Sequence, residues 1–354
     1  MIQFVGPSSF ESTIQCPAQT YYSKKRKNIV PRHPKIFFNT ICHYVLEHIK
    51  KKHIIDASKL EILWDEELSK FNENLKQDQI ESANFPLQNN LNNYYIHKKN
   101  FIYGIINNFK LNIDRITRQS KRVFLKEYAL EIDGIKARID LIKQIDDQII
   151  ICDYKFGKIF DDNGGIKPNY IKQMYIYAAM YYLKNNVIPK GLYLIDNHFN
   201  YHQIENKEIS ICIDYFNNLK RINLKLNEIG NSIDALAKPN DENCKYCNSK
   251  IYCESFWETK RFNPSQFQDS IRGAITRYKK INEYWYFELR NDDLRETSKI
   301  NRIQCKDYTP MEDDMIWFFN IKHIRDNFYV FHKYSILIKK QRGCNYGGTR
   351  TTRN

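Results

Sequence analysis

The sequence lacks any apolar run of about 18 residues or more, the length that a membrane-spanning helix requires. Its first residues, MIQFVGPSSFEST, lack the basic and apolar regions of a signal peptide. We therefore expect a cytoplasmic location and no membrane partner. With 354 residues, the chain is long enough for a large core and an additional domain.

Signature motifs of several enzyme classes are also missing. The sequence has no Gly-rich dinucleotide-binding motif, no G-x-S-x-G motif and no Walker A motif. Gly164 and Gly165 form a turn that lacks the spacing and context of a phosphate-binding loop. We see no hydride, acyl or glycosyl chemistry, and any unwinding motor that works with this protein must be a separate chain.

What the chain has in excess is positive charge, with 55 Lys and Arg against 41 Asp and Glu and a net charge of +14. Such a surplus favours a polyanionic partner, of which nucleic acid is the commonest. The alternative is a Lys-rich compositional bias, which would also account for the 14% of aromatic residues. Nine cysteines in a cytoplasmic chain indicate metal or cluster ligation rather than disulfides.

Residues 123–154 predict three consecutive strands. Two runs of branched and aromatic residues, VFLKEYALEI and IKARIDLIKQ, flank Asp133 and Gly134, the favoured dipeptide of a type I′ turn. A third run, 149–152, is apolar without alternation, as expected of a strand that is buried on both faces. These patterns predict a meander that ends in the core of a sheet.

Charged residues stand in this meander where a sheet would otherwise hold apolar ones. Asp140 lies on the second strand, Asp153 ends the third, and Lys155 follows two residues later, on the same face as Asp153. A divalent cation between the acids would explain them, because magnesium prefers oxygen ligands. Lys155 would then hold the attacking water or the phosphate charge. The alternative is that these acids and the lysine are merely solvated.

This combination resembles the PD-(D/E)XK nuclease superfamily, in the RecB-like branch that includes CRISPR-associated adaptation exonucleases and the nuclease parts of helicase-nucleases. The family's second-strand acid corresponds to Asp140 in ARIDLI, and its acid-x-lysine motif to Asp153 and Lys155 in DYKFG. Its helix signature Gln-x-x-x-Tyr corresponds to Gln173 and Tyr177 in QMYIY. The resemblance implies an α/β, restriction-endonuclease-like core.

The same resemblance implies a metal-ligand set and a substrate-positioning pair. His43 in TICHYVLEH takes the place of a metal-binding histidine on an early helix, so that His43, Asp140 and Asp153 would hold Mg²⁺ or Mn²⁺. Gln173 and Tyr177 would position the substrate. By pattern alone, a histidine on such a helix is more often a core residue, and Tyr177 an ordinary buried tyrosine.

The sequence departs from the family in two places. Ala137 and Thr40 stand where the family usually or often has glycine, three residues before the second-strand acid and before the histidine. Both are small, so the departures are mild. Glu127 corresponds to an acid often seen at the start of the meander, and the resemblance covers roughly residues 8–257.

Four cysteines form a second candidate site. Cys244, Cys247 and Cys253 follow the spacing C-x2-C-x5-C, and Cys16, which precedes a proline, is the natural fourth ligand. Four thiolates suit zinc or an iron–sulfur cluster, and the spacing does not choose between them. In the resembling nucleases, the same one-plus-three arrangement holds a [4Fe-4S] cluster, which the resemblance therefore implies here.

From about residue 263, short strands rich in aromatic residues predict a small five-stranded barrel that weakly resembles an oligonucleotide-binding (OB-like) fold. Its aromatic residues would either stack single-stranded bases or form the core of the barrel; they are Tyr278, Trp285, Tyr286 and Phe287. Three domains are expected: a nuclease domain over 1–258, the OB-like barrel over 259–340, and a disordered basic tail over 341–354.

Between the meander and the cysteines, residues 190–196, 198–204 and 208–214 predict three further strands, and residues 215–229 predict a helix. A basic group before the meander would give a positively charged approach to it; its members are Arg115, Arg118, Lys121 and Arg122.

The function that we expect is metal-dependent hydrolysis of DNA, by an exonuclease that acts on single-stranded ends in repair, recombination or defence, with a separate helicase or defence subunit as a candidate partner. One alternative is a non-catalytic subunit that binds single-stranded nucleic acid on a nuclease-like scaffold. The other is a zinc-bound structural subunit of a larger repair or defence complex.

Overall fold

The computed structural model describes residues 2–26, 31–52, 56–78, 81–109, 122–145, 147–245, 247–263, 266–290, 300–305, 311, 314–319, 321–325, 328–331, 335–339 and 351–352. The basic group that precedes the meander and the predicted disordered tail fall almost entirely outside these residues. The chain forms two compact units, one of Met1–Ile14 and His33–Gly230, the other of Gln15–Arg32 and Asn231–Asn354. These units cut across the division at residue 258, which stays a sequence-based prediction.

The first unit is built on a five-stranded sheet in the order β1-β2-β3-β4-β5. Its strands are β1 (Arg122–Ile132), β2 (Ile135–Ile145), β3 (Gln148–Tyr154), β4 (Gly191–Ile195) and β5 (Tyr201–Ile204). β3 and β4 are parallel, and the other neighbours are antiparallel. The predicted meander is confirmed, and Asp133 and Gly134 both have positive φ, at 50° and 76°, as a type I′ turn requires.

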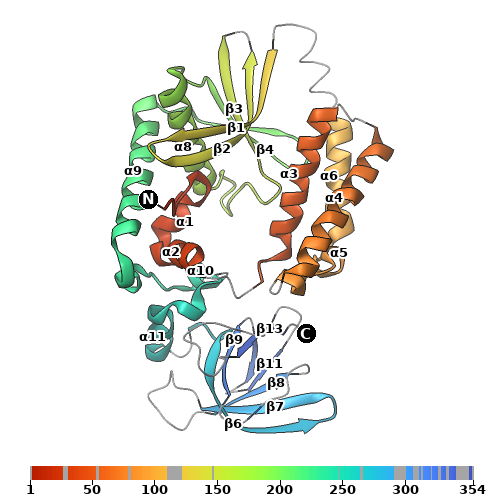
Figure 1. The fold of residues 1–354 in the computed structure, drawn as a ribbon, viewed down its shortest axis with the longest axis vertical. Helices are drawn as coiled ribbons and strands as arrows, with labels where there is room; N and C mark the ends of the chain where they lie inside the picture. The colour runs from red at the N-terminus through yellow and green to blue at the C-terminus, as the bar shows by residue number, and fades with distance from the viewer. Residues whose placement is uncertain are drawn as a thin grey trace. The chain divides into compact units, whose positions relative to one another are not determined.

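Helices cover both faces of this sheet (Figure 1). On one side lie α3 (Pro34–Lys52), α4 (Ala57–Gln77) and α6 (Tyr94–Gly104), whose apolar residues share a core with Leu141 and Cys152. On the other side lie α8 (Pro168–Asn185), which links β3 to β4, and α9 (Ile209–Glu228). Because neighbouring strand residues in register share a face, the buried row Ile142, Ile151 and Leu192 belongs to this second side.

Shorter elements complete the first unit. They are η1 (Pro7–Ser9), α1 (Phe10–Gln15), η2 (Glu81–Asn84), α5 (Leu87–Asn90) and the single π-helical turn η3 (Ile105–Phe109). The N-terminal segment is fastened to α9 by Asn223, which is 1% exposed and whose side-chain oxygen accepts the N–H groups of Phe4 and Val5 at 2.9 and 3.0 Å. The start of the chain is thereby held against α9.

The strand predicted over 208–214 is wrong, because α9 already begins at Ile209. Ile209, Ile211 and Ile213 alternate as in a strand, but the residues that bury are Cys212, Phe216 and Leu219, at helical spacing. The strands predicted at 190–196 and 198–204 correspond to β4 and β5 and are confirmed.

The second unit joins α2 (Pro17–Lys25) to helices that follow residue 230 and to a sheet. Its other helical elements are η4 (Gly230–Leu236, whose first residue belongs to the first unit), α10 (Asp241–Lys245), η5 (Lys250–Tyr252) and α11 (Glu254–Phe262). Its strands are β6 (Ile271–Ile281), β7 (Tyr284–Arg290), β8 (Ile300–Cys305), β9 (Met315–Phe319), β10 (Lys322–Arg325), β11 (Phe328–Val330), β12 (Ile336–Lys339) and β13 (Thr351–Thr352).

These strands pair in one row, β10-β11-β8-β7-β6-β9-β12-β13. Among the residues that the structure describes, no pairing joins β10 to β13, so a closed OB-like barrel is not shown. The predicted runs contain β6 to β12, but the described row has eight strands and not the five that the sequence predicted. Alternation along a strand fixes which side chains bury, but closure depends on pairing between strands far apart in the sequence, which the pattern does not encode.

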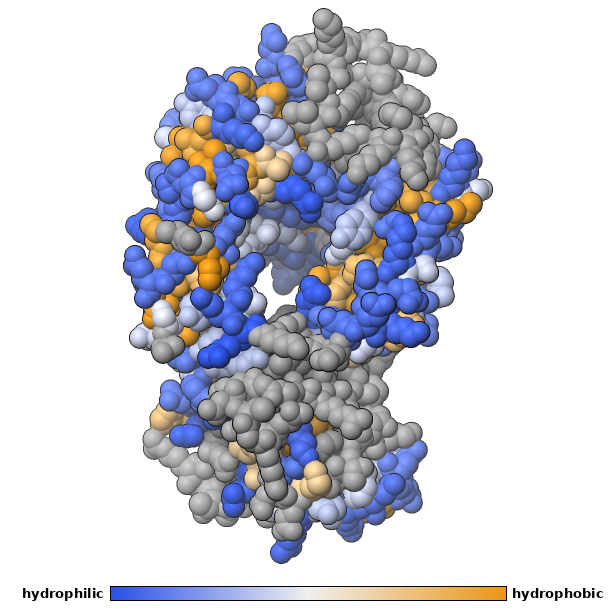
Figure 2. Space-filling model, in the orientation of Figure 1, coloured by the Kyte–Doolittle hydropathy of each residue, from blue (hydrophilic) through white to orange (hydrophobic). Residues whose placement is uncertain are grey.

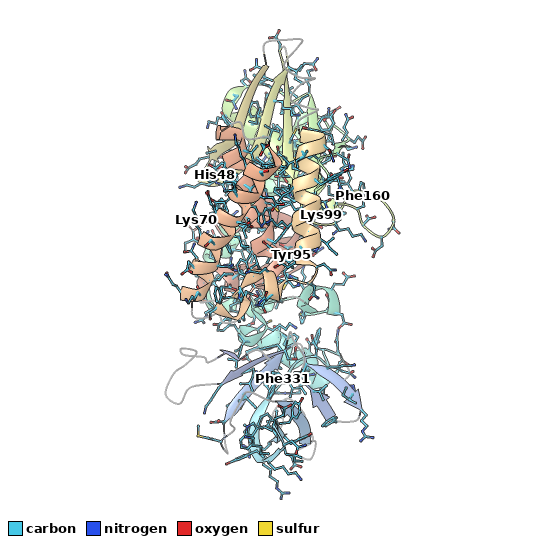
Figure 3. All side chains as sticks on the ribbon, turned by 90° about the vertical axis from the view of Figure 1, so that its right-hand side faces the viewer. His48, Lys70, Tyr95, Lys99, Phe160 and Phe331 are labelled. Atoms are coloured by element: carbon cyan, nitrogen blue, oxygen red, sulfur yellow. The ribbon has the colours of Figure 1, made fainter. Side chains whose placement is uncertain are left out.

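On the face seen in Figure 2, hydrophilic residues dominate the surface of the first unit, and hydrophobic ones form separate small patches. Single exposed aromatic residues include Tyr95 on α6, which is 71% exposed and lies one turn from Lys99 (Figure 3). Scattered apolar exposure of this kind is ordinary for a folded protein. Within the described residues, no helix has the length and apolarity to cross a bilayer.

Candidate active site and cysteine site

Three carboxylates form a row across β1, β2 and β3 of the first unit's sheet, which we call the acidic edge. Asp153 is the residue before the last of β3 and is 3% exposed. Leu141 pairs with Cys152, so the continued register sets Asp140 opposite Asp153. Glu127 stands opposite Asp140 at an interruption of the β1–β2 pairing, with φ at +48°. A non-glycine residue with positive φ is uncommon, and at this position the Oε2 atom of Glu127 accepts a hydrogen bond of 3.2 Å from Arg138.

Lys155 is held in place by polar contacts on two sides. Its Nζ lies 2.5 Å from Asp153 Oδ2 and donates to Gln173 Oε1 at 2.8 Å. The ammonium also lies 4.7 Å from the centre of the Tyr170 ring, which favours a cation. The predicted pairing of Asp153 and Lys155 on one face is therefore present, and the lysine is fixed rather than solvated.

Gln173 connects this pair to Tyr177. Both are buried on α8, one turn apart, and Gln173 Nε2 donates to the Tyr177 hydroxyl at 2.9 Å and to Asp153 Oδ1 at 3.4 Å. The same amide accepts from Lys155 through its oxygen, so both of its ends are used. The helix signature that the sequence suggested thus belongs to the acid–lysine site.

The charges of the site determine its protonation states. Burial alone would lower the pKa of Lys155, but the charge of Asp153 and the hydrogen bond to it outweigh burial and raise that pKa above its usual value. Burial, together with the charges of Asp153 and Asp140, raises the pKa of the Tyr177 hydroxyl well above its usual value. At neutral pH the site therefore contains an ammonium and a neutral phenol.

Asp140 is held by the backbone and faces His43. Its Oδ2 accepts the N–H of Tyr154 at 2.9 Å and lies 4.0 Å from His43 Nδ1. The imidazole of His43 packs edge-on against Phe156, with ring centres 5.1 Å apart. His48, one turn and a residue further along α3 (Figure 3), instead bonds the carbonyl of Tyr44 in its own helix.

The donor set of this edge suits a hard divalent cation, since it offers two carboxylates and an imidazole, which Mn²⁺ also accepts. Asp153 is nearly inaccessible and is matched here by the charge of Lys155. Within the described ranges, however, no group of three His, Cys, Asp or Glu side chains is close enough together to hold a metal ion. The ligand set His43, Asp140 and Asp153 therefore remains a proposal.

A second polar pair, which no sequence motif indicated, lies after the neighbouring strand. Asp196 follows β4 directly, where the backbone N–H of Lys155 donates to the Ile195 carbonyl at 2.8 Å. Asp196 accepts His202 Nε2 at 2.9 Å, and Phe160, on the loop after β3 (Figure 3), packs edge-on against His202. Hydrogen bonds from His202 and Asn200 outweigh the effect of burial and lower the pKa of Asp196. This pair follows β4, and the parallel pairing of β3 with β4 sets it next to the backbone of Lys155. A local sequence motif does not show which strands pair.

All four predicted cysteine ligands line one small cavity of the second unit. Cys16 and Cys244 are buried, and Cys247 and Cys253 are partly exposed. The segment that carries Cys16 is joined to the later one by the Asn243 side chain, which donates to the Gln15 carbonyl at 3.2 Å. Residues more than 220 positions apart in the sequence thus line one cavity, whereas their role as ligands stays a prediction.

The thiols are not disulfide-bonded. Burial raises the pKa of Cys244, that of Cys247 to about 11 and that of Cys253 to about 12. Without a bound cation these three are therefore neutral thiols at pH 7. As at the acidic edge, no three of the cysteines are within metal-ligand geometry in the described part of the chain. The donor set is a tetrathiolate in composition, and its closure around a metal remains a proposal.

The aromatic residues proposed for base stacking differ in accessibility. Phe287 is fully buried in the core of the second unit's sheet, so no base can reach its ring there. Tyr278 is 46% exposed, whereas Trp285 and Tyr286 are partly exposed. The rings of Tyr278 and Trp285 are in edge contact, with centres 6.0 Å apart, and Lys280 lies 5.4 Å from the Trp285 ring.

Comparisons with known proteins give one family. The model of the PD-(D/E)XK nuclease superfamily matches residues 5–254 of this chain. No curated protein matches. One of the solved structures that match is titled "Crystal structure of SSO0001", with 14% identity over 69% of this chain and 96% of that one and a TM-score of 0.23, which is too low to establish a shared arrangement.

Proposed function

Since this chain belongs to the PD-(D/E)XK nuclease superfamily, whose members are typically metal-dependent nucleases, we propose that it hydrolyses DNA phosphodiester bonds at the acid–lysine edge of the first unit. The observation that supports this most is the bridge from Asp153 through Lys155 to Gln173, with both contacts of Lys155 Nζ at 2.8 Å or less. A mostly buried ammonium fixed beside a carboxylate near the end of a strand can stabilise the negative charge that develops on a reacting phosphate.

Each of these side chains has a task in the proposed reaction. Asp140 and Asp153, with His43, are the residues that would hold Mg²⁺ or Mn²⁺. The bound cation would polarise the phosphate and lower the pKa of a coordinated water. Lys155 is an ammonium at neutral pH, so it stabilises negative charge on the phosphate or orients the water and does not act as the base. Gln173 fixes Lys155, and Tyr177 fixes the amide of Gln173.

The cysteine site belongs to the proposed function as a structural centre. Cys16, Cys244, Cys247 and Cys253 would hold a [4Fe-4S] cluster, with zinc as the alternative. In either case the centre would cross-link the segment around Cys16 to the segment around Cys244. The cysteines themselves form no disulfide that could do so. Metal binding of this kind stabilises the folded state in proportion to its affinity.

The proposed substrate is DNA with single-stranded ends, degraded in repair, recombination or defence with the help of a separate helicase or defence subunit in the cytoplasm. The net charge of +14 supports a polyanionic substrate. A second candidate function is single-strand binding without cleavage. It is supported by Tyr278, Trp285 and Lys280 on the sheet of the second unit, whether or not that sheet forms an OB-like barrel.

The experiment is to incubate the anaerobically purified chain with single- and double-stranded DNA labelled at either end, with Mn²⁺, Mg²⁺ or EDTA. We expect cleavage of single strands with Mn²⁺ or Mg²⁺ and none with EDTA, and the product ladder gives the polarity. Binding of single strands without cleavage under any metal would contradict the nuclease proposal and favour the second candidate. Tyr278→Ala should then weaken that binding several-fold, since exposed stacking contributes about 1 kcal/mol per base.

A further inference from the structure

Lys250 is a buried lysine whose polar contacts are all long. The residue is 5% exposed. Its Nζ lies 3.5 Å from Ser270 Oγ and 3.7 Å from Asp269 Oδ2, and the Asp269 side chain is itself 39% exposed, so solvent screens that ion pair. The rings of Phe256 and Phe319 lie 5.8 and 5.9 Å from the ammonium, at the limit of cation–π attraction. Burying an ammonium costs several kcal/mol, which these long contacts offset only in part.

The second unit holds another buried lysine that shows what ordinary compensation looks like. Lys260 is also 5% exposed, and its Nζ donates to the Phe267 carbonyl at 3.0 Å, a normal hydrogen-bond length. Lys260 is not among the residues that line the cysteine cavity. Lys250 lines that cavity, and it lies in the loop between Cys247 and Cys253. The buried lysine without a short polar contact is therefore the one that lines the cavity of the thiols.

We propose that Lys250 is the counter-charge of an anionic metal–tetrathiolate centre held by Cys16, Cys244, Cys247 and Cys253. The inference rests on the cofactor part of the proposed function and assigns a role to a residue outside the ligand set. The ammonium stabilises the thiolate form of the site, and the loop that carries two ligands carries their compensating charge as well.

The physical reason is the charge of such a centre. A zinc ion or an oxidised [4Fe-4S] cluster with four thiolate ligands is a net anion, and reduction of the cluster by one electron makes it more negative. An ammonium in a low-dielectric wall stabilises the more negative state most, so it raises the reduction potential of a cluster. For zinc, the same charge favours retention of the metal, because the bound tetrathiolate is anionic.

The test compares the wild-type chain with Lys250→Met, which keeps the length of the side chain and removes its charge. Both are loaded anaerobically with iron and sulfide, iron and sulfide are counted per chain, and the cluster is titrated with dithionite while its absorbance is followed. At a fixed potential, we expect the reduced fraction relative to the oxidised one to fall about tenfold in the variant, which is a decrease of about 60 mV in midpoint for one electron. Lys250→Arg should restore most of the difference, and Lys260→Met should leave the midpoint unchanged.

If the wild type binds zinc and no iron, the readout becomes the rate at which a chelator removes zinc, which should be about tenfold faster in Lys250→Met than in Lys260→Met. Equal midpoints or equal release rates in wild type and Lys250→Met would overturn the role of Lys250 while leaving the centre in place. A wild type that binds neither metal would overturn the cofactor part of the proposed function and this inference with it. Should Lys250→Met fail to fold, Lys250→Gln takes its place in the same comparison.

Discussion

The side chain of Lys155 in the first unit is 15% exposed and that of Lys250 in the second is 6% exposed. Each lysine lies within three residues of a candidate ligand, but their surroundings differ. Lys155 Nζ has oxygen partners at 2.5 and 2.8 Å, whereas the oxygen partners of Lys250 Nζ are at 3.5 and 3.7 Å. The first lysine has short polar contacts within the protein. The second has only long ones, to a serine and to a partly exposed carboxylate.

The two lysines differ in how far contacts within the folded protein fix them in the absence of a ligand. At the acidic edge, strand register, a helix and an amide fix the lysine before any substrate arrives, as electrostatic catalysis requires. At the cysteine site, the chain brings four thiols and an ammonium together, and the proposed metal centre would supply the negative charge that faces the ammonium. The acidic edge should therefore depend on single side chains for activity, and the cysteine site on its cofactor for stability.

The largest expected effect comes from removing a charge at the acidic edge. Asp153→Asn keeps the size of the side chain but removes the carboxylate that pairs with Lys155, so cleavage should fall by about 10³-fold or more. The check is single-turnover cleavage of end-labelled single-stranded DNA with Mn²⁺. Asp162→Asn is the matched control, because that carboxylate is 98% exposed on the loop after β3, and its rate should equal that of the wild type.

Disrupting the cysteine site should lower the stability of the fold more than it lowers the rate of DNA cleavage by the intact fold. Cys244→Ser removes one ligand, so the purified chain should contain less iron or zinc and should unfold about 10 °C lower, as expected if the centre contributes a few kcal/mol. Scanning calorimetry with parallel metal analysis measures both. Cys212→Ser, at a buried cysteine of α9 outside the cavity, should keep the metal content. Equal metal content in the two variants would show that Cys244 is not a ligand.

A smaller effect is expected when the support of Lys155 is removed and its charge is kept. Gln173→Ala deletes the amide that accepts from Lys155 and donates to Tyr177, so the ammonium is less well fixed. We expect kcat to fall roughly 10- to 100-fold with KM little changed, because positioning is lost and binding is kept. A rise in KM at constant kcat would instead assign Gln173 to substrate binding.

The smallest effect is the pH dependence of the contribution that Lys155 makes to stability. Its pKa in the folded state is raised, so its contribution is complete below the unfolded value of about 10.4 and is lost only as the pH rises through the folded value. The difference in free energy of unfolding between wild type and Lys155→Met should therefore be constant from pH 6 to 9. Urea denaturation at several pH values tests this, and a steady decrease over that range would mean that Lys155 is not paired as described.

Much of the acidic edge could be predicted from the sequence, because its residues are tied to local patterns. Asp-Gly between two β-rich runs defines the meander, and a spacing of two sets Asp153 and Lys155 on one face. Gln173 and Tyr177 follow from helical spacing. The Asp196–His202 pair could not be found in this way, because it reaches the edge only through the parallel pairing of β3 with β4.

In the second unit, local sequence patterns predicted some features and not others. The spacing of Cys244, Cys247 and Cys253 predicted a shared site, and the cavity brings Cys16 to it. The weak compensation of Lys250 is invisible in the sequence, because burial and partner distances depend on packing. Likewise, the alternation of aromatic and polar residues predicted the strands, but it did not predict which aromatic side chains face the core. Phe287 does so, and Tyr278 is exposed.

The most direct test of the central claim is to measure Mn²⁺ affinity and single-turnover DNA cleavage for wild type and Lys155→Met side by side. We expect the variant still to bind Mn²⁺, since the carboxylates and His43 remain, and we expect cleavage to fall by about 10²- to 10³-fold because the fixed ammonium is gone. Cleavage at the wild-type rate by Lys155→Met would show that the bridge from Asp153 to Gln173 has no part in the reaction.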